Sequence, residues 1–279
     1  VTAAGKAILI TDCNSRIGYA LARQLDDLGF TVYAGFLNVD NGSSKKLKEE
    51  SSGRLHVLQL DVTSENQILA AYDYVRENLP HEAAGLWAVV NSATWASFGE
   101  VEWVPYTVYR QATEVNLLSL IRITQIFLPL VRKTKGRIIN IVSILGRIAS
   151  PLRSPYCTVK FGVEAFSDCL RLEMRRWGVD VVVVEPGDYT TGKTWYTDKE
   201  LLAQAKFMWK TMSDETRSEY GEDYFEQSET DLTPVLRSLS DAVIRTFPLA
   251  RYTSVTRAEK LQAFVSDHLP RSVYDIIYT

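Results

Sequence analysis

Six short apolar runs, separated by longer segments of mixed polarity, constrain the fold of this chain most strongly. They cover residues 6–11, 31–35, 56–60, 86–90, 137–142 and 179–184 and are nearly continuous in aliphatic residues. Such runs are typical of strands in a parallel sheet that is buried on both faces. The segments 18–28 and 64–77 between them show helical spacing of apolar residues, whereas the polar stretch 40–46 is expected to be a loop. This alternation predicts an α/β fold with a doubly wound parallel sheet, whose ligands bind at the carboxyl ends of the strands.

Length, charge and cysteine content exclude several other classes of protein. The 279 residues carry no internal repeat, so we expect one domain spanning 1–279. The net charge is −3 and the basic residues are scattered, which argues against a nucleic-acid partner. Three irregularly spaced cysteines favour neither a disulfide framework nor a metal site, which suits a reducing intracellular compartment.

Two features of the sequence bear on the location of the protein within the cell. We find no run of about 18 to 20 apolar residues of the kind that spans a bilayer. The sequence begins at Val1 rather than Met, so a preceding segment that directs the protein to mitochondria or the endoplasmic reticulum is compatible with it.

The segment 190–233 breaks the rhythm of strands and helices. It is rich in aromatic and charged residues, and it follows the sixth apolar run, so we expect it over the carboxyl ends of the strands. Two interpretations remain. The segment is either a helical appendage that packs its own aromatic residues, or a lid whose apolar face meets a lipophilic substrate.

Three side chains form a candidate catalytic group. Tyr156 and Lys160 are four residues apart, which places them on one face of a helix. A nearby cation favours the phenolate of a tyrosine, whose unperturbed pKa of about 10 otherwise makes it a poor acid–base catalyst at neutral pH. Ser143 follows the fifth apolar run, so its hydroxyl is expected at the carboxyl edge of the sheet, beside Tyr156.

The runs Asn140–Gly146 and Ser154–Phe166, which contain these residues, resemble the active-site region of the short-chain dehydrogenase/reductase family. The resemblance covers nearly the whole chain. It implies a Rossmann-like fold and hydride transfer between a nicotinamide and an alcohol or ketone. It also implies that Ser143 and Tyr156 bind the substrate oxygen, that Tyr156 transfers the proton, and that Lys160 lowers the pKa of Tyr156 and binds the nicotinamide ribose. Asn116, in Glu114-Val-Asn-Leu, matches the family residue that holds a water in the proton relay.

Residues 29–38 and 268–278 resemble the branch of the family that holds hydroxybutyrate, 17β-hydroxysteroid and retinol dehydrogenases, with an insect steroidogenic member as a candidate relative. Asp61-Val-Thr matches the family turn whose carboxylate meets the adenine, and residues 186–191 match the loop at the nicotinamide end. The resemblance therefore implies cofactor contacts from fourteen residues, namely Thr11, Asn14, Ser15, Arg16, Ile17, Gly18, Phe36, Asp61, Val62, Asn91, Ala93, Pro186, Gly187 and Thr190.

The phosphate-binding turn departs from the family pattern T-G-x-x-x-G-x-G. Asp12 and Arg16 replace its first two glycines, and Thr94 replaces the glycine of the family's N-N-A-G run. Asp12 would repel a pyrophosphate unless it is paired, and Arg16 is its expected partner or else a direct phosphate ligand. Either the enzyme is active with a modified turn, or the chain has lost cofactor binding and serves as a binding or scaffold protein. The complete set of Asn116, Ser143, Tyr156 and Lys160 favours the enzyme.

The choice of cofactor and substrate rests on weaker signals. Neither an acidic residue at Phe36 nor an arginine directly after it is present, and we expect NAD, with NADP the alternative because of Arg16. The aromatic segment 190–233 favours a small lipophilic secondary alcohol or ketone, a steroid before a retinoid. Arg153 or Lys193 could instead hold the carboxylate of a small hydroxy acid. The alternative function is therefore that of a 3-hydroxybutyrate dehydrogenase. The resemblance also implies a homodimer or homotetramer.

Overall fold

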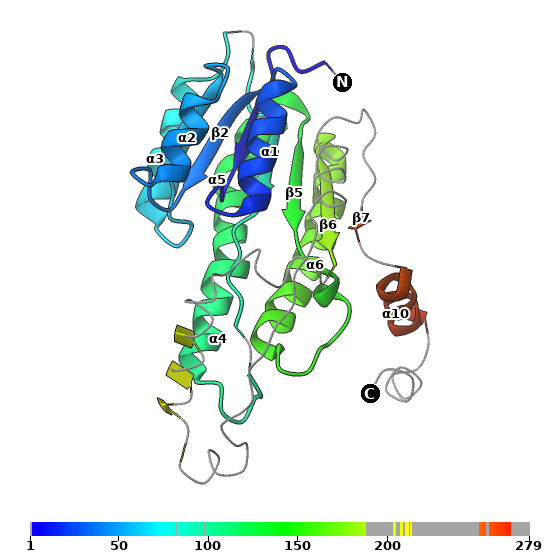
Figure 1. Ribbon diagram of the computed structural model, residues 1–279. Helices are drawn as coiled ribbons and strands as arrows, with labels where there is room; N and C mark the ends of the chain where they lie inside the picture. The colour runs from blue at the N-terminus through cyan, green and yellow to red at the C-terminus, as the bar shows by residue number, and fades with distance from the viewer. Residues whose placement is uncertain are drawn as a thin grey trace.

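Seven parallel strands form one sheet in the order β3-β2-β1-β4-β5-β6-β7 (Figure 1). The structure is a computed structural model, and it describes residues 2–81, 83–97, 99–187, 203–204, 207–208, 210–211, 213, 251–254 and 257–268. The strands are β1 (Ala7–Ile10), β2 (Thr31–Phe36), β3 (Leu55–Gln59), β4 (Ala88–Asn91), β5 (Arg137–Ile141), β6 (Asp180–Pro186) and β7 (Arg251–Ser254). The six apolar runs thus correspond to β1 to β6, which confirms the predicted doubly wound sheet.

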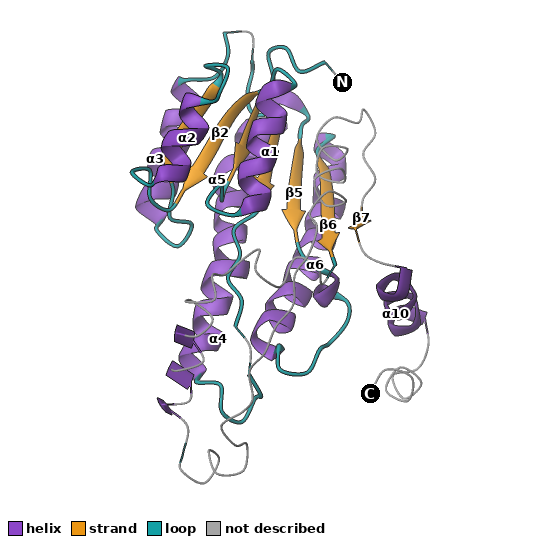
Figure 2. Cartoon of the chain, in the orientation of Figure 1, coloured by secondary structure: helices purple, strands orange, loops and turns teal. Residues whose placement is uncertain are grey.

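Helices cover both faces of the sheet (Figure 2). On one face, α1 (Arg16–Asp27) and α2 (Gly42–Glu49) pack against side chains from β1, β2, β4, β5 and β6. On the other face lie α3 (Glu65–Glu77), α5 (Ser119–Thr134) and α6 (Ser154–Met174). Residues such as Ile10 and Leu9, adjacent in β1, are both fully buried, one in each of these layers. Burial on both faces explains why the strands are apolar without alternation.

The stretch 40–46, expected as a loop, instead leads into α2. The side chain of Asn41 accepts a hydrogen bond from the Ser44 backbone N–H at 2.8 Å and so caps the helix. Leu47 is fully buried against the core, and it gives this polar helix its anchor. The prediction of a loop was wrong. The Asn41 cap and the burial of Leu47 stabilise a helix here, although most of its residues are polar and exposed to solvent.

A long helical stretch runs from α4 (Tyr106–Thr113) through a π-helical turn, η1 (Glu114–Leu118), into α5. By length and composition alone, residues Tyr106–Thr134 could cross a membrane, although 44% of the relevant window is buried inside the protein. Ile123, Phe127 and Leu130 pack under the sheet, so the core accounts for much of the apolar character of this helix. In η1, the backbone N–H of Ser119 bonds the carbonyl of Glu114, one residue farther back than in an α-helix.

Three further helices follow β5, α6 and β7. A 3-10 turn, η2 (Ile144–Gly146), follows β5, and a second, η3 (Arg175–Trp177), follows α6. Beyond β7, α10 (Arg257–His268) contributes Ala263 and Val265 to a cluster with Tyr156 and Cys157 of α6.

The connection order reverses between β1 and β4, which are neighbours in the sheet although β2 and β3 lie between them in sequence. Side chains bind these two strand ends together. The hydroxyl of Thr11 accepts hydrogen bonds from the backbone N–H groups of Ser92 (3.0 Å) and Ala93 (3.3 Å). The Ser92 hydroxyl in turn accepts from the Asp12 N–H at 3.0 Å. In open α/β sheets, such a reversal marks the place where ligands bind.

Candidate active site

Tyr156 and Lys160 lie on the first two turns of α6, which begins at Ser154 with a proline at its second position. Both side chains are buried, with exposed fractions of 5% and 1%. The Lys160 ammonium lies 5.3 Å from the centre of the Tyr156 ring, and it donates a hydrogen bond to the carbonyl of Ile141 at 3.2 Å. The predicted spacing therefore brings the phenol and the amine together beside the end of β5.

Ser143 caps η2 and lies two residues after the end of β5. Its hydroxyl accepts a hydrogen bond from the Leu145 backbone N–H at 3.1 Å, and the side chain is buried. The same hydroxyl acts on the phenol of Tyr156 and opposes the rise in its pKa. Gly146 allows α6 to approach this turn, since a Cβ there would lie 2.9 Å from Val142 and 3.1 Å from the Lys160 carbonyl. The structure thus places Ser143 and Tyr156 as the sequence predicts.

Asn116 lies in η1, where its side chain makes four hydrogen bonds. The amide nitrogen donates to the carbonyls of Trp95 (2.7 Å) and Ala112 (2.9 Å). The amide oxygen accepts from the Trp95 N–H at 3.0 Å and from the Thr94 hydroxyl at 2.8 Å. Asn116 therefore fixes the segment after β4 against the helix, and this side chain has little capacity left for a water.

Thr94 is a residue at this site that sequence reasoning missed. The sequence shows only that Thr94 replaces a glycine of the family pattern. In the structure, its hydroxyl donates a hydrogen bond to the Asn116 amide oxygen at 2.8 Å, and it also opposes the rise in the pKa of Tyr156. The signal in the sequence was the hydroxyl itself, which glycine lacks.

Burial governs the protonation of the pair on α6. Loss of solvent raises the pKa of Tyr156 to about 12, although the hydroxyls of Thr94 and Ser143 and the charge of Arg153 act in the opposite direction. Loss of solvent also lowers the pKa of Lys160 to about 7, despite the opposing effect of the Glu164 carboxylate. In the protein without cofactor, the neutral phenol is thus the dominant form, and the amine titrates near neutrality.

A charged network lies one helical turn beyond Lys160. Arg251 of β7 forms ion pairs with Glu164 (2.7 Å) and with the fully buried Glu185 (2.5 Å) at the end of β6. Arg147 pairs with Glu185 at 3.4 Å and with Asp267 of α10. Burial, together with the neighbouring Glu185, raises the pKa of Glu164 to about 7 against the opposing effect of Arg251. The network joins the two C-terminal elements to the helix that bears Tyr156 and Lys160.

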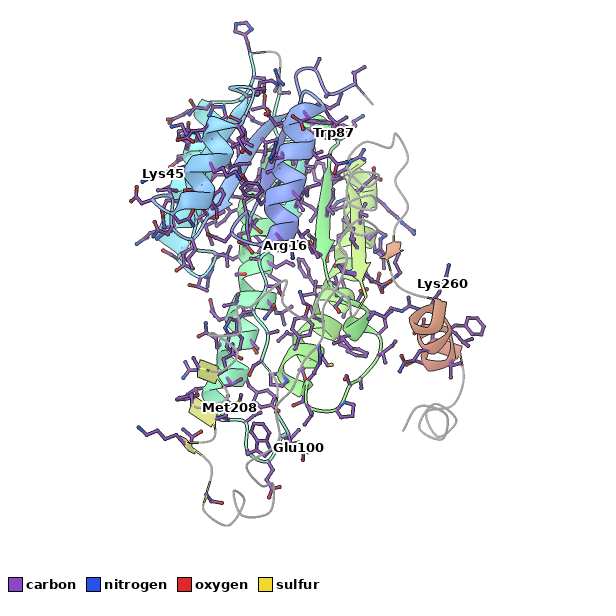
Figure 3. All side chains as sticks on the ribbon, viewed as in Figure 1. Arg16, Lys45, Trp87, Glu100, Met208 and Lys260 are labelled. Carbon is purple, nitrogen blue, oxygen red and sulfur yellow. The ribbon has the colours of Figure 1, made fainter. Side chains whose placement is uncertain are left out.

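The turn after β1 keeps the geometry of an anion-binding helix N-terminus. Ser15 caps α1 by accepting a hydrogen bond from the Gly18 N–H at 3.1 Å. A Cβ on Gly18 would lie 1.8 Å from the Asp12 carbonyl oxygen, so this position requires glycine. Arg16 is exposed at the first position of the helix, at the carboxyl edge of the sheet (Figure 3). The N-terminal turn of this 12-residue helix, with the exposed Arg16 at its start, is of the kind that binds a pyrophosphate.

Asp12 does not pair with Arg16 as expected. Its carboxylate accepts hydrogen bonds from the backbone N–H (2.9 Å) and side-chain amide (3.1 Å) of Asn14. Burial raises the pKa of Asp12. This local arrangement is an Asx turn, which a carboxylate two residues before an N–H forms more readily than a longer ion pair. The carboxylate is therefore directed into the turn.

The other predicted cofactor residues fall into two groups. Asp61 and Val62 follow β3, and the Asp61 carboxylate accepts from the N–H (2.9 Å) and hydroxyl (2.7 Å) of Thr63. Thr11, Asn14, Ser15, Ile17, Ala93, Pro186 and Gly187 also lie at the carboxyl edge, on the ends of β1, β4 and β6 and the start of α1. By contrast, the side chains of Phe36 and Asn91 are directed into the interior, where Asn91 bonds Asn140 at 2.8 Å. Thr190 lies outside the described residues.

Comparison with known proteins places the chain in a family. Residues 6–201 match the family described as short chain dehydrogenase. The chain belongs to the short-chain dehydrogenase family. This dehydrogenase is 40% identical to the mitochondrial D-beta-hydroxybutyrate dehydrogenase of Mus musculus, over 99% of its own length and 84% of the relative. It is 36% identical to estradiol 17-beta-dehydrogenase 2 of Rattus norvegicus and 35% identical to retinol dehydrogenase 16 of Mus musculus, over 98% of its length in both cases and 74% and 87% of theirs.

Solved structures share the fold of this dehydrogenase. A short-chain dehydrogenase from Streptomyces avermitilis superposes with a TM-score of 0.74 at 19% identity, covering 98% of this chain and 96% of its own. A second from Burkholderia cenocepacia, solved in complex with NADP, gives a TM-score of 0.70 at 18% identity, with full coverage of both chains. The expected branch of hydroxybutyrate, 17β-hydroxysteroid and retinol dehydrogenases is confirmed. The dehydrogenase is an oxidoreductase that uses a nicotinamide cofactor on a secondary alcohol or ketone.

Proposed function

We propose that this dehydrogenase uses NAD to interconvert a lipophilic secondary alcohol and its ketone, with a steroid as the preferred class. The observation that carries the substrate class is an apolar cluster beside the catalytic end of the site. Trp95 follows Thr94 directly and packs with Trp103, Val104 and Val108, and Met208 joins the same cluster. Figure 3 labels Met208 near the foot of α4. An apolar, aromatic wall of this kind suits a large ring system better than a small hydroxy acid.

The proposed roles of the catalytic residues follow from their contacts. Ser143 keeps its proton while it accepts from Leu145, so it can donate to the substrate oxygen. Tyr156 exchanges the proton with that oxygen, and in the reduction direction its high pKa keeps the phenol protonated at neutral pH, so that it has a proton to donate. Lys160 stabilises the phenolate through its charge and is the residue that would hold the nicotinamide ribose. The bound nicotinamide supplies or accepts the hydride. Asn116 holds the Thr94–Trp95 segment in place beside them.

We also propose that part of the segment 190–233 covers the substrate. Most of it, including Thr190 and Lys193, lies outside the described residues. In the part that the structure describes, Gln204 donates to the Ala96 carbonyl at 3.3 Å, and Met208 is buried among the residues that follow β4. These contacts support a lid over the carboxyl ends of the strands rather than a separate appendage.

NAD is the proposed cofactor because the described end of β2 presents no basic side chain. Leu37 and Asn38 follow the buried Phe36, and the next residues of the turn are Val39 and Asp40. A 2′-phosphate would need a cation here. If the cofactor were NADP, Arg16 is the residue that the sequence suggests as the partner of its 2′-phosphate. Titration calorimetry with NADH and NADPH tests the choice, with Arg16→Gln as the matched variant. Tighter binding of NADPH that is lost in R16Q would overturn the proposal.

A second substrate class has a specific observation in its favour. Arg153 is half-buried at the start of α6, and its charge acts on Tyr156. A guanidinium in this place could hold the carboxylate of 3-hydroxybutyrate. Of the relatives reported above, the D-beta-hydroxybutyrate dehydrogenase has the highest identity.

A substrate panel separates the two classes. We would follow cofactor absorbance with 17β-hydroxysteroids, retinol and 3-hydroxybutyrate, using Tyr156→Phe as the inactive control and Arg153→Gln as the discriminating variant. Steroid turnover that is insensitive to R153Q supports the proposal. Turnover of 3-hydroxybutyrate alone, reduced in R153Q, would replace it with the second class. The homodimer or homotetramer stays a prediction, which light scattering would test. The mitochondrial or endoplasmic-reticulum location also stays a prediction, which cell fractionation would test.

A further inference from the structure

Two buried polar groups near the catalytic end of the site have no hydrogen-bond partner among the described residues. They are the hydroxyl of Ser97 and the side-chain oxygen of Gln204. Ser97 is 5% exposed, and the Gln204 oxygen is likewise closed off from solvent. A buried polar group without a partner costs free energy, so each of these two groups calls for an explanation.

Both groups flank the peptide bond that joins Ala96 to Ser97. The Gln204 amide nitrogen donates to the Ala96 carbonyl at 3.3 Å, and Ser97 is the next residue of the chain. Ala96 packs against the apolar cluster that contains Tyr156. The two groups therefore lie close to the place where the substrate oxygen is expected.

The chain on either side of this peptide is held in place. The backbone N–H of Gly99 donates to the Leu152 carbonyl at 2.6 Å, and Gly99 forms a parallel bridge with Arg153, which directly precedes α6. On the other side in sequence, Trp95 packs with the cluster that contains Met208, beyond the carboxyl ends of the strands (Figure 3). The peptide is thus tied both to the start of α6 and to the described part of the proposed lid.

The contact with Ala96 determines which atom of the Gln204 amide is left over. A backbone carbonyl only accepts, so the amide nitrogen must face it, and the amide oxygen stays without a donor. Ser97 has one proton to donate as well as lone pairs. Among the described residues, the two groups bond neither each other nor any third group.

A single hydroxyl group satisfies both of them. It donates its proton to the Gln204 oxygen and accepts the proton of Ser97. A ketone or carboxylate oxygen can only accept, so it would bond Ser97 and leave the Gln204 oxygen without a donor. The pair therefore selects a hydroxyl over these two other oxygen groups.

We propose that Ser97 and Gln204 form a second polar subsite, which binds a substrate hydroxyl other than the one that reacts. Ser143 and Tyr156 take up the reacting oxygen, so the second hydroxyl is a separate group on the same molecule. The preferred substrate is then a lipophilic diol, or the corresponding hydroxy-ketone in the reduction direction. This inference rests on the proposed function, because it specifies the substrate class of the same site.

Titration calorimetry in the presence of NADH tests the subsite without turnover, because the reduced cofactor cannot take a hydride from an alcohol. The two ligands are estradiol, which carries a second hydroxyl at the far end of its ring system, and 3-deoxyestradiol, which lacks it. Ser97→Ala and Gln204→Met remove the two polar groups. Ser43→Ala, at an exposed position of α2, is the matched control.

We expect the wild type and S43A to bind estradiol roughly 10- to 100-fold more tightly than 3-deoxyestradiol, because the second hydroxyl makes two hydrogen bonds. S97A and Q204M should each reduce this preference, and the double variant should abolish it. Equal affinity of the wild type for the two ligands would overturn the proposal, as would a preference that survives in the double variant. If Q204M does not fold, an unchanged preference in S97A alone has the same meaning.

Turnover of the same two ligands with NAD distinguishes failure of the subsite from failure of the proposed function. Preferential binding of estradiol without turnover of any steroid would support the subsite and overturn the proposed function. Turnover of both ligands with equal kcat/KM would support the proposed function and overturn the subsite. Absence of binding of either ligand would overturn both.

Discussion

Replacing Lys160 by methionine should make this dehydrogenase inactive yet more stable. The lysine side chain is 1% exposed, and its one described hydrogen bond goes to the Ile141 carbonyl. Burial lowers its pKa from 10.5 to about 7. Between these two values the unfolded chain binds a proton that the native protein does not. The stability of the wild type therefore rises as the pH increases through this window, and the penalty for burying Lys160 is greatest at its lower end.

The size of the effect follows from the shift in pKa. Burying the amine costs about 4 kcal/mol at pH 7, about 2 kcal/mol at pH 9 and under about 1 kcal/mol at pH 10. Methionine removes this penalty and loses one hydrogen bond, worth about 1 kcal/mol. We expect Lys160→Met to gain about 3 kcal/mol at pH 7 and about 1 kcal/mol at pH 9, with no gain near pH 10.

Urea denaturation of both proteins across this pH range, followed by circular dichroism, measures the difference. Lys45→Met, at an exposed position of α2, is the matched control and should show no dependence on pH. A K160M protein that is less stable than the wild type at neutral pH would refute the reasoning. So would a stability difference that does not change with pH. Either result would mean that Lys160 is held in its charged form by contacts stronger than the carbonyl of Ile141.

Three other predictions test separate parts of the site. Gly18→Ala should abolish dinucleotide binding in titration calorimetry without unfolding the protein, since a Cβ 1.8 Å from the Asp12 carbonyl must displace the turn; wild-type affinity would contradict this. Tyr156→Phe should reduce turnover by roughly 10²- to 10⁴-fold while NADH still binds, and residual activity above a tenth of the wild type would count against an acid–base role. Arg251→Met should destabilise the protein by about 3 to 5 kcal/mol in urea denaturation, because Glu164 and Glu185 lose a partner inside the protein. Arg251→Lys is the milder control, and a change under about 1 kcal/mol in R251M would show that water reaches these carboxylates.

The sequence predicted those parts of the fold whose pattern reflects local burial. β1 to β6 were recognised because burial on both faces requires continuous apolar residues. β7 was missed because Arg251-Tyr-Thr-Ser is short and polar, and its arginine is retained by two glutamates that are distant in sequence. α2 was missed because its single fully buried apolar residue, Leu47, gives almost no periodic signal.

The site shows the same division between local and long-range information. The spacing of Tyr156 and Lys160 determines their common face, so this pair could be predicted from the sequence. The contact between Thr94 and Asn116 depends on the orientation of the Asn116 amide, which backbone groups at residues 95 and 112 determine. The predicted ion pair of Asp12 with Arg16 was wrong, because Asp12 instead accepts a hydrogen bond from Asn14, which is only two residues away in the sequence. Contacts of this kind depend on loop conformation, which residue spacing does not specify.

β7 covers the edge of β6, and this protects the chain from association with other copies of itself. It pairs with β6 along Val183 to Pro186, and without it β6, with its run of four valines, would form the border of the sheet. An apolar border strand offers unpaired N–H and carbonyl groups to any other chain in the same state. A chain that ends before Arg251, whether through truncation or incomplete synthesis, would carry six strands of the sheet and an open border. Such a chain should aggregate through β6 rather than persist as a soluble fragment.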